Sequence, residues 1–229
     1  MATSSDTAPA YILRYFEFTG LGEACRMLLT AAKANWVEEN PEWPQEKQNQ
    51  PFGRMPVLIE KATDGGADYV LSESPTIERY LGRVFGFLPA DQKIASRQEQ
   101  IRDQQIDIVV HFFIKHGLAG KDEAANLKFD ELLSKMFEVH SRILRENGSN
   151  GHFIGDSLSF IDICTYAFFE LFLKFLTKFQ ADITEVVVSR LTPEIAKLLT
   201  TVESDPHFEE YLSTRAKLGP LFADKVTCK

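Results

Sequence analysis

Cysteine is scarce in this chain of 229 residues, and its three cysteines, Cys25, Cys164 and Cys228, stand far apart. This spacing forms neither a disulfide framework nor a zinc-binding pattern, so we expect a reducing, cytoplasmic environment. Basic residues are also in the minority, because 25 Lys and Arg face 33 Asp and Glu and leave a net charge of −8. Nucleic acid requires a basic surface, and we therefore exclude it as a partner.

Long uninterrupted hydrophobic runs are absent as well. The most apolar stretch, residues 158–176, contains Asp162, Glu170 and Lys174, so we predict a buried helix and no membrane span. Residues 1–9 are rich in Ser, Thr and Ala and lack the hydrophobic region of a signal peptide, and we expect a mobile tail. The five histidines are scattered, and we expect no metal site.

The first 85 residues show an α/β pattern. Asp64-Gly65-Gly66 separates two apolar runs and predicts a hairpin. We expect strands at 11–18, 35–38, 57–60 and 69–71, and helices at 23–33 and 75–85. The segment Gly86-Phe87-Leu88-Pro89 marks a boundary, after which only helices are predicted, at 92–114, 122–147, 159–178, 193–204 and 206–213. Ser159 and Asp162 form a capping-box-like start for the helix that we place at the centre of this second unit.

The region from Trp43 to Ser74 has the composition of a site for a small charged ligand. Ser74-Pro75 indicates a helix start, with Ser as the N-cap, and a helix N-terminus attracts anions. Glu73 places a carboxylate beside it, and this pair suits a zwitterion. Met55-Pro56 opens a buried strand, and a cis peptide there would leave the Met55 backbone free to pair with an extended ligand. A plain helix cap and a plain strand-opening proline are the alternative interpretations.

The order and spacing of several short motifs extend over nearly the whole chain. They are Tyr15-Phe16, Trp43-Pro44 with Lys47, Phe52-Gly53-Arg54-Met55-Pro56, Glu73-Ser74 with Ile77, and Gly155-Asp156-Ser157 before Ser159 and Asp162. Together they resemble the cytosolic glutathione S-transferases, most closely the tyrosine-type, sigma-like members. The resemblance implies a thioredoxin-like, glutathione-binding domain at residues 10–85, a linker at 86–91 and an all-helical domain at 92–229, preceded by the tail at 1–9.

The resemblance assigns the glutathione-binding residues one by one. Ser74 would hold the γ-glutamyl carboxylate, and Glu73, where Gln is commoner, would hold the γ-glutamyl ammonium. The backbone of Met55, before Pro56, would pair with the cysteinyl amide. The glycyl end would contact Trp43, Lys47 and Arg54. Asp107 falls where members of this group reach across a homodimer to the partner's ligand, although an Asp on a helix surface is usually only solvated.

The resemblance makes Tyr15 the catalytic residue. A free thiol titrates near ~8.5, and a Tyr hydroxyl that donates to the sulfur favours the thiolate. A downward pKa shift of about two units corresponds to roughly 2.7 kcal/mol. Tyr11 is the rival, but it stands at the start of the strand. Many sigma-like members have an arginine at the position of Leu21, so here Tyr15 acts alone or with a backbone N–H of the turn at residues 19–22.

The second substrate would be a hydrophobic electrophile in an apolar cleft between the domains. The residues that we expect to line this cleft are Phe16, Phe18, Leu21, Val109, Phe113 and Phe222; Val109 and Phe113 could instead be core residues. Phe52 is a candidate aromatic key in a dimer interface, and Cys25 is expected to be a buried structural thiol.

Three functions remain in competition at this stage. The first is conjugation of glutathione to hydrophobic electrophiles in detoxification, with glutathione peroxidase activity as an addition. The second is a glutathione-dependent isomerase of the prostaglandin-synthase kind, and the third is a non-catalytic carrier of the same fold. Glutathione acts as co-substrate in the first two, and no other cofactor is expected.

Overall fold

The structure, a computed structural model, describes residues 10–117 and 122–213. Its sheet contains four strands in the order β2-β1-β3-β4. The two central strands are β1 (Tyr11–Arg14) and β3 (Val57–Glu60), and the edges are β2 (Trp36–Glu39) and β4 (Tyr69–Ser72). Strand β1 runs parallel to β2 and antiparallel to β3, and β3 and β4 form the predicted hairpin.

The first strand is shorter than predicted and ends at Arg14 instead of Phe18. The backbone N–H of Tyr15 still donates to the carbonyl of Glu39 at 3.0 Å, and the chain then leaves the sheet. The next carbonyls, of Phe16 and Phe18, accept hydrogen bonds from the guanidinium of Arg26. A side chain therefore replaces the sheet partner along this segment, and Tyr15 lies just beyond the end of β1.

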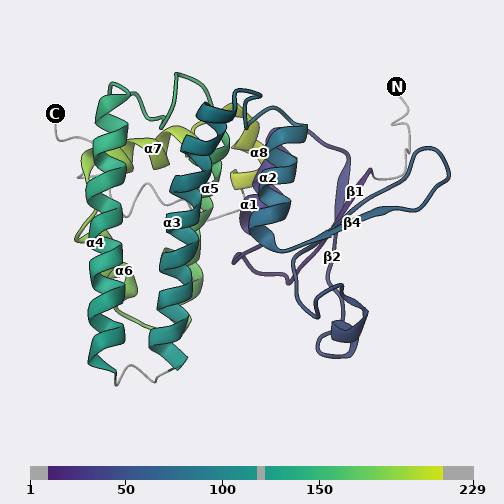
Figure 1. Ribbon diagram of the computed structural model, residues 1–229, viewed down its shortest axis with the longest axis horizontal. Coiled ribbons are helices and arrows are strands. Elements are labelled where there is room, and N and C mark those ends of the chain that lie inside the picture. The colour runs from purple at the N-terminus through teal and green to yellow at the C-terminus, as the bar shows by residue number, and fades with distance from the viewer. Residues whose placement is uncertain (1–9, 118–121, 214–229) are drawn as a thin grey trace.

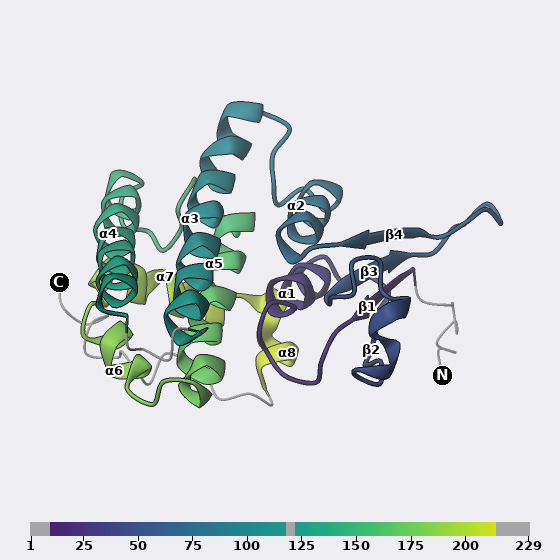
Figure 2. The ribbon, with the colours of Figure 1, turned by 60° about the horizontal axis from the view of Figure 1, so that its bottom comes forward.

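Two helices cover one face of the sheet and separate it from the helical half of the molecule (Figures 1 and 2). They are α1 (Glu23–Ala31) and α2 (Ser74–Val84). Residues 45–49 form a short 3-10 helix, η1, that the sequence did not predict. This arrangement is the thioredoxin-like fold that the sequence motifs imply.

The second half of the described chain is helical, as predicted. Its long helices α3 (Gln92–Gly117) and α4 (Glu123–Glu146) lie side by side, and α5 (Phe160–Glu170) lies behind α3 in Figure 1. The remaining helices are α6 (Ile183–Val188), α7 (Pro193–Glu203), the 3-10 turn η4 (Pro206–Phe208) and α8 (Glu209–Ser213). Helix α6 was missed, because six residues with no Pro or Gly boundary give little periodic signal.

Helix α5 is the centre of the helical half. All of its residues are buried, and the predicted capping box at its start is present between Ser159 and Asp162. The helical conformation extends to Lys178, as predicted, but the type of helix changes: the α-helix stops at Glu170 and is followed by a π-helical segment, η2 (Leu171–Phe175), and a 3-10 turn, η3 (Leu176–Lys178).

A single hydrophobic core extends through both halves of the chain. Helix α1 packs on α5, and α2 is joined to α3 by the buried ion pair of Glu78 with Arg102, in which two donor–acceptor distances are 2.7 and 2.6 Å. Within the described ranges, no helix combines the length and apolar character that a bilayer crossing requires.

Candidate active site

Tyr15 lies at the junction between the sheet and the helical half, with only 5% of its surface exposed. Its hydroxyl oxygen accepts a hydrogen bond of 2.9 Å from the backbone N–H of Leu21. Burial raises the pKa of Tyr15, whereas the Leu21 N–H and the positive charge of Arg26 lower it. The phenol therefore stays protonated at neutral pH and can donate its hydrogen to a sulfur anion. With Leu21 at the position of the arginine, Tyr15 was expected to act either alone or with a backbone N–H of the turn. The hydrogen bond from the Leu21 N–H supports the second alternative.

Two glycines fit closely around the Tyr15 side chain. A Cβ atom on Gly20 would lie 2.8 Å from the Tyr15 hydroxyl oxygen, and a Cβ on Gly22 would lie 2.5 Å from a ring carbon. Gly20 also has φ +99°, a left-handed conformation that side chains rarely adopt. The turn between β1 and α1 can thus place its backbone N–H groups against Tyr15 only because these positions lack side chains.

Arg26 is a site residue that the sequence analysis missed. Its guanidinium lies over the Tyr15 ring, with the central carbon 5.3 Å from the ring centroid. It donates to the carbonyls of Phe16 at 2.7 Å and Phe18 at 3.0 Å, and to the carboxylate of Glu23 at 3.0 Å. The pair Glu23-x-x-Arg26 at a helix start was the available signal, but such pairs usually lie on a solvated face.

Glu73 and Ser74 stand where β4 passes into α2. Glu73 has φ 70°, a left-handed conformation uncommon for residues with side chains, and its carbonyl accepts the N–H groups of Thr76 and Ile77. The predicted N-cap was therefore wrong by one residue: Glu73 is the N-cap, and Ser74 is the first helical residue. Ser74 is 5% exposed, and Glu73 is exposed beside it.

Arg54 lies next to Glu73, with a guanidinium nitrogen 4.0 Å from a carboxylate oxygen. The side chains of Arg54 and Glu73 are 77% and 48% exposed, so solvent screens this pair. The sequence interpretation assigned the two residues to opposite ends of glutathione, whereas the structure brings them together.

Three of the other predicted glutathione residues, Trp43, Met55 and Pro56, lie on the loops that precede β3, and Lys47 lies in η1. Both Trp43-Pro44 and Met55-Pro56 are cis peptides, as considered for Met55, and Pro56 is buried. Within the described chain, Met55 makes no backbone hydrogen bond, so its N–H and C=O are open to a ligand. Lys47 is exposed, and no described carboxylate pairs with it.

Asp107 lies away from this group, exposed on α3. Its carboxylate pairs with the His111 ring one helical turn along, at 3.3 Å. Among residues 10–117 and 122–213, no hydrogen bond or ion pair joins Asp107 to Tyr15, Glu73 or Ser74. A role for it at a glutathione site would need a second subunit.

The predicted electrophile cleft is only partly assembled. Leu21 and Val109 line the same cavity between the halves, but its volume is about 10 Å³, too small for a substrate. Phe16, Phe18 and Phe113 do not line this cavity; Phe16 and Phe18 stack on each other at 5.2 Å. Phe222 lies outside the described residues.

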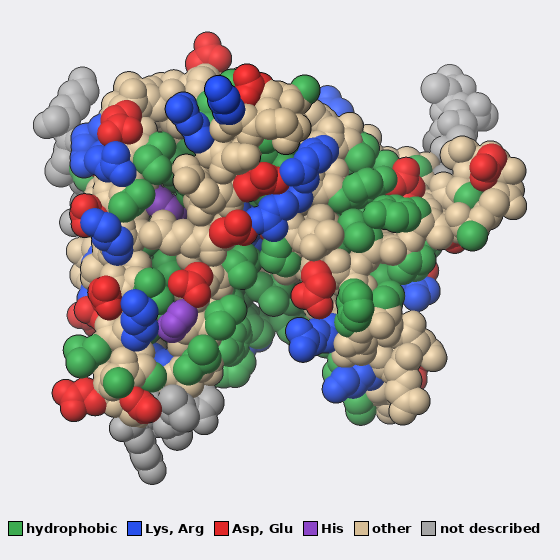
Figure 3. Space-filling model, viewed as in Figure 1, with side chains coloured by type: hydrophobic (Ala, Val, Ile, Leu, Met, Phe, Trp, Pro, Cys, Tyr) green, Lys and Arg blue, Asp and Glu red, His purple; other side chains and the backbone are tan. Residues whose placement is uncertain are grey.

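Figure 3 shows an open hollow between the helical half and the lobe that carries η1. Hydrophobic side chains cover its walls, and charged side chains of both signs lie near its rim. No group of three or more metal-ligating side chains occurs among residues 10–117 and 122–213.

Family models match both halves of the chain. One described as "Glutathione S-transferase, N-terminal domain" matches residues 12–83, and one described as "Glutathione S-transferase, C-terminal domain" matches residues 103–215. The chain is 32% identical over 162 residues to probable glutathione S-transferase 7 of Caenorhabditis elegans, covering 67% of this chain and 75% of that protein. It is 24% identical to S-crystallin 4 of Enteroctopus dofleini, covering 91% and 98%.

Solved structures share the architecture. The sigma-class glutathione S-transferase of Fasciola hepatica has a TM-score of 0.66 at 26% identity, covering 92% of this chain and 99% of that one. Prostaglandin synthase D of Nilaparvata lugens has a TM-score of 0.61 at 26% identity, with 91% and 99% covered. A monomeric enzyme of Necator americanus, Na-GST-3, has a TM-score of 0.67 at 26% identity, with 90% and 98% covered.

Proposed function

Because this chain belongs to the glutathione S-transferase family, we propose that it conjugates reduced glutathione to hydrophobic electrophiles and that Tyr15 activates the thiol. The observation that supports this role most directly is the buried Tyr15 hydroxyl, which accepts the Leu21 N–H and keeps its own proton. Detoxification in the cytoplasm, and glutathione peroxidase activity on lipid peroxides, belong to the same proposal.

Binding of glutathione would use polar groups at the start of α2 and in the segment before β3. The γ-glutamyl ammonium would replace Arg54 as the partner of Glu73, and the carboxylate would reach Ser74 and the amides at the start of α2. The open N–H and C=O of Met55 would pair with the cysteinyl residue. Trp43 and Lys47 would contact the glycyl carboxylate, and Arg54, released from Glu73, would add positive potential there.

The chemical step needs no metal in this mechanism. The thiol proton leaves to solvent as glutathione binds, and the Tyr15 hydroxyl donates a hydrogen bond to the resulting thiolate. The sulfur electron pair then forms a bond to the electrophilic carbon, and the leaving group departs with the electrons of the broken bond. Arg26 holds the backbone after Tyr15 and adds positive charge beside its ring.

An ultraviolet difference titration of bound glutathione tests the role of Tyr15. We expect a thiolate absorbance at neutral pH in the wild type that moves to clearly higher pH in Tyr15→Phe. Tyr11→Phe is the matched control, because the Tyr11 ring packs edge-on against Phe85 at 5.7 Å on the core side of the sheet. A thiolate signal that Tyr15→Phe leaves unchanged would transfer the role to another donor, and saturable binding without any thiolate would leave a carrier.

Two alternatives rest on similar proteins. A glutathione-dependent isomerase, as the similarity to prostaglandin synthase D suggests, would use the same thiolate and regenerate it, so its product would have the mass of its substrate. A non-catalytic carrier, as the similarity to an S-crystallin suggests, would bind glutathione without turnover across a broad set of electrophiles. The intact Tyr15 site favours an enzyme.

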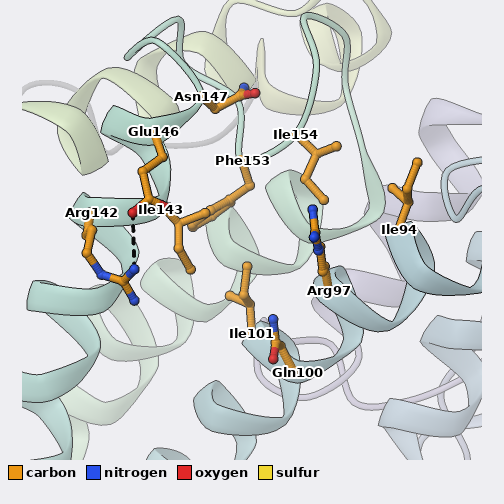
Figure 4. A pocket seen from close by; sticks show the side chains of 10 residues that line it. All are labelled: Ile94, Arg97, Gln100, Ile101, Arg142, Ile143, Glu146, Asn147, Phe153 and Ile154. Carbon is orange, nitrogen blue, oxygen red and sulfur yellow. Dashed lines mark hydrogen bonds and ion pairs between the residues drawn. The ribbon is translucent and has the colours of Figure 1, made fainter.

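We also propose a homodimer in which Phe52 is the contact residue. Phe52 is 68% exposed on the loop before β3. On the other half of the chain, a cavity of about 530 Å³ opens between α3 and α4. Figure 4 shows Ile101, Ile143 and Phe153 gathered around it, with charged side chains at its rim. In a two-fold dimer each subunit would insert Phe52 into the partner's cavity, which makes two equal contacts.

Sedimentation of wild type and Phe52→Ser tests this assembly. We expect a dimer in the wild type and a concentration-dependent shift to monomer in the variant, because an aromatic side chain leaves an apolar cavity. Tyr69→Ser, which removes another exposed aromatic from the same half, is the control. A monomeric wild type would contradict the proposal and would also remove the role of Asp107 across the interface.

A further inference from the structure

Six aromatic rings form a continuous row across the opening between the two halves of the chain. Neighbouring ring centroids are 4.7–5.9 Å apart. In order, the aromatic row contains Trp43, Phe16, Phe18, Phe175, Phe179 and Phe113. It begins at the proposed glutathione site, and the Tyr15 ring contacts two of its members, Phe16 and Phe18, at 5.4 and 5.8 Å. An electrophile that approaches the sulfur near Tyr15 must therefore meet this surface.

The irregular end of the central helix brings Phe175 into the row. Every residue of α5 is buried, but the π-helical segment η2 changes the helical register before Phe175. Phe175 becomes partly exposed and stacks on Phe18 of the other half, with centroids 4.7 Å apart and planes 11° apart.

Lys178, at the end of η3, places a positive charge over this stack. Its Nζ lies 5.4 Å from the Phe175 centroid and 5.8 Å from the Phe18 centroid. Lys178 is exposed and forms no ion pair with a carboxylate in the described ranges, unlike Lys174, which pairs with Glu170. The chain has a net charge of −8, so Lys178 supplies a local positive charge on an otherwise acidic protein. This charge can pair with an anionic ligand.

We propose that the preferred second substrate is an amphipathic anion, whose apolar part lies on the aromatic row and whose carboxylate, or a similar anionic group, pairs with Lys178. Lys178 is then a specificity-determining residue. This inference rests on the proposed glutathione transferase function and narrows its substrate class from any hydrophobic electrophile to one that also carries a negative charge.

A matched pair of electrophiles tests the inference: a chlorodinitrobenzoate and its methyl ester. In both, the sulfur–carbon bond forms and the carbon–chlorine bond breaks, with chloride leaving as the anion. We expect Lys178→Met to lower kcat/KM for the benzoate by about 1.5- to five-fold, the usual range for an exposed charge pair, and to leave the ester unchanged. Lys178→Arg should preserve the preference, and added salt should weaken it in the wild type.

Lys135→Met is the control, because it removes the same charge from α4, where Lys135 pairs with Glu138. An unchanged benzoate-to-ester ratio in Lys178→Met would overturn the inference while leaving the proposed function in place. Turnover of neither compound would contradict the proposed function. Equilibrium binding of the two S-aryl glutathione conjugates would then decide the inference, and an affinity ratio that Lys178→Met does not alter would overturn it.

Discussion

Tyr15 owes its position to residues that the ligand would not touch. Gly22 lies so close to the Tyr15 ring that a side chain at this position would not fit. Arg26 lies over the ring and donates hydrogen bonds to the carbonyls of Phe16 and Phe18. The phenol is thus enclosed by α1, which begins directly after the glycine turn. Small displacements of a reacting group cost large factors in rate, so these neighbours would share in the role proposed for Tyr15.

Gly22→Ala tests this dependence. The new methyl group would lie 2.5 Å from a carbon of the Tyr15 ring, so the ring must move away from the Leu21 N–H. We expect kcat to fall at least about ten-fold, with the bound thiol titrating at higher pH, as measured by conjugation kinetics and ultraviolet titration. In a Tyr15→Phe background the same substitution should have little further effect. An equal loss in both backgrounds would mean that Gly22 acts elsewhere.

At the scale of single residues, the sequence indicates which residues could bind a ligand better than it indicates which residues contact each other. Short motifs identified Tyr15, Met55 and Glu73 as ligand-facing candidates, and the structure places all three on loops or at element ends. Arg26 was missed because its pair with Glu23 is of a kind that usually lies on a solvated face, and because its bonds to the carbonyls of Phe16 and Phe18 leave no trace in residue types. The small cavity at Leu21 and Val109 depends on how two halves of the chain close, which no local pattern encodes.

The start of α5 depends on one buried carboxylate. Asp162 accepts the backbone N–H of Ser159 at 3.0 Å, the hydroxyl of Ser159 at 2.8 Å and the N–H of Phe153 at 2.9 Å. The His152 ring lies 3.0 Å from the same carboxylate, and this hydrogen bond raises the pKa of His152. Four groups on two segments thus converge on a single side chain that is fully buried.

Asp162→Asn should therefore destabilise the protein strongly. The amide nitrogen cannot accept the hydrogen bonds that one carboxylate oxygen now receives, and buried donors would be left unpaired. We expect the free energy of unfolding to fall by about 2–4 kcal/mol, measured by urea denaturation. Asp156→Asn is the control, since Asp156 is exposed in the preceding loop. A loss no larger than that of the control would contradict this account.

The boundaries of helices and strands were predicted correctly where the local sequence signal was strong. The hairpin at Asp64-Gly65-Gly66 and the capping box at Ser159 were predicted from turn and cap chemistry, and both are confirmed. The change from α- to π-helix at Leu171 was not predicted, because the run of apolar residues continues across it unchanged. No Pro or Gly marks that end of α5.

Two buried carboxylates meet where the halves of the molecule join. Glu23 on α1 and Glu170 at the end of α5 are both inaccessible to solvent. Burial, together with the negative charge of Glu23, raises the pKa of Glu170 to about 7, although Lys174 opposes the rise. In the unfolded chain a Glu titrates near ~4.3. Between these values the folded state binds a proton that the unfolded state does not, so stability falls as pH rises from about 4 to about 7.

Glu170→Gln should remove this pH dependence. The neutral amide carries no charge to repel Glu23, and we expect the variant to exceed the wild type in stability by roughly 1–3 kcal/mol at pH ~8 and to match it more closely at pH ~5. Thermal unfolding monitored across this range measures the difference. Glu138→Gln, an exposed carboxylate on α4, is the control. A stability difference that is constant with pH would show that Glu170 does not titrate in this range.

The continuous core also determines which segments of this chain can be exchanged with those of its relatives. The predicted linker divides the sequence into two parts, but α1 is packed on α5 and Glu78 is paired with Arg102 across that division. A chimera that joins residues 10–85 to the helical half of a relative would therefore need a partner surface for α1 and a cation opposite Glu78. Exchange between relatives should therefore yield well-folded hybrids only when α1, α2, α3 and α5 are inherited together. In this architecture the helices that pack across the domain boundary must be exchanged as one set, and neither domain can be exchanged alone.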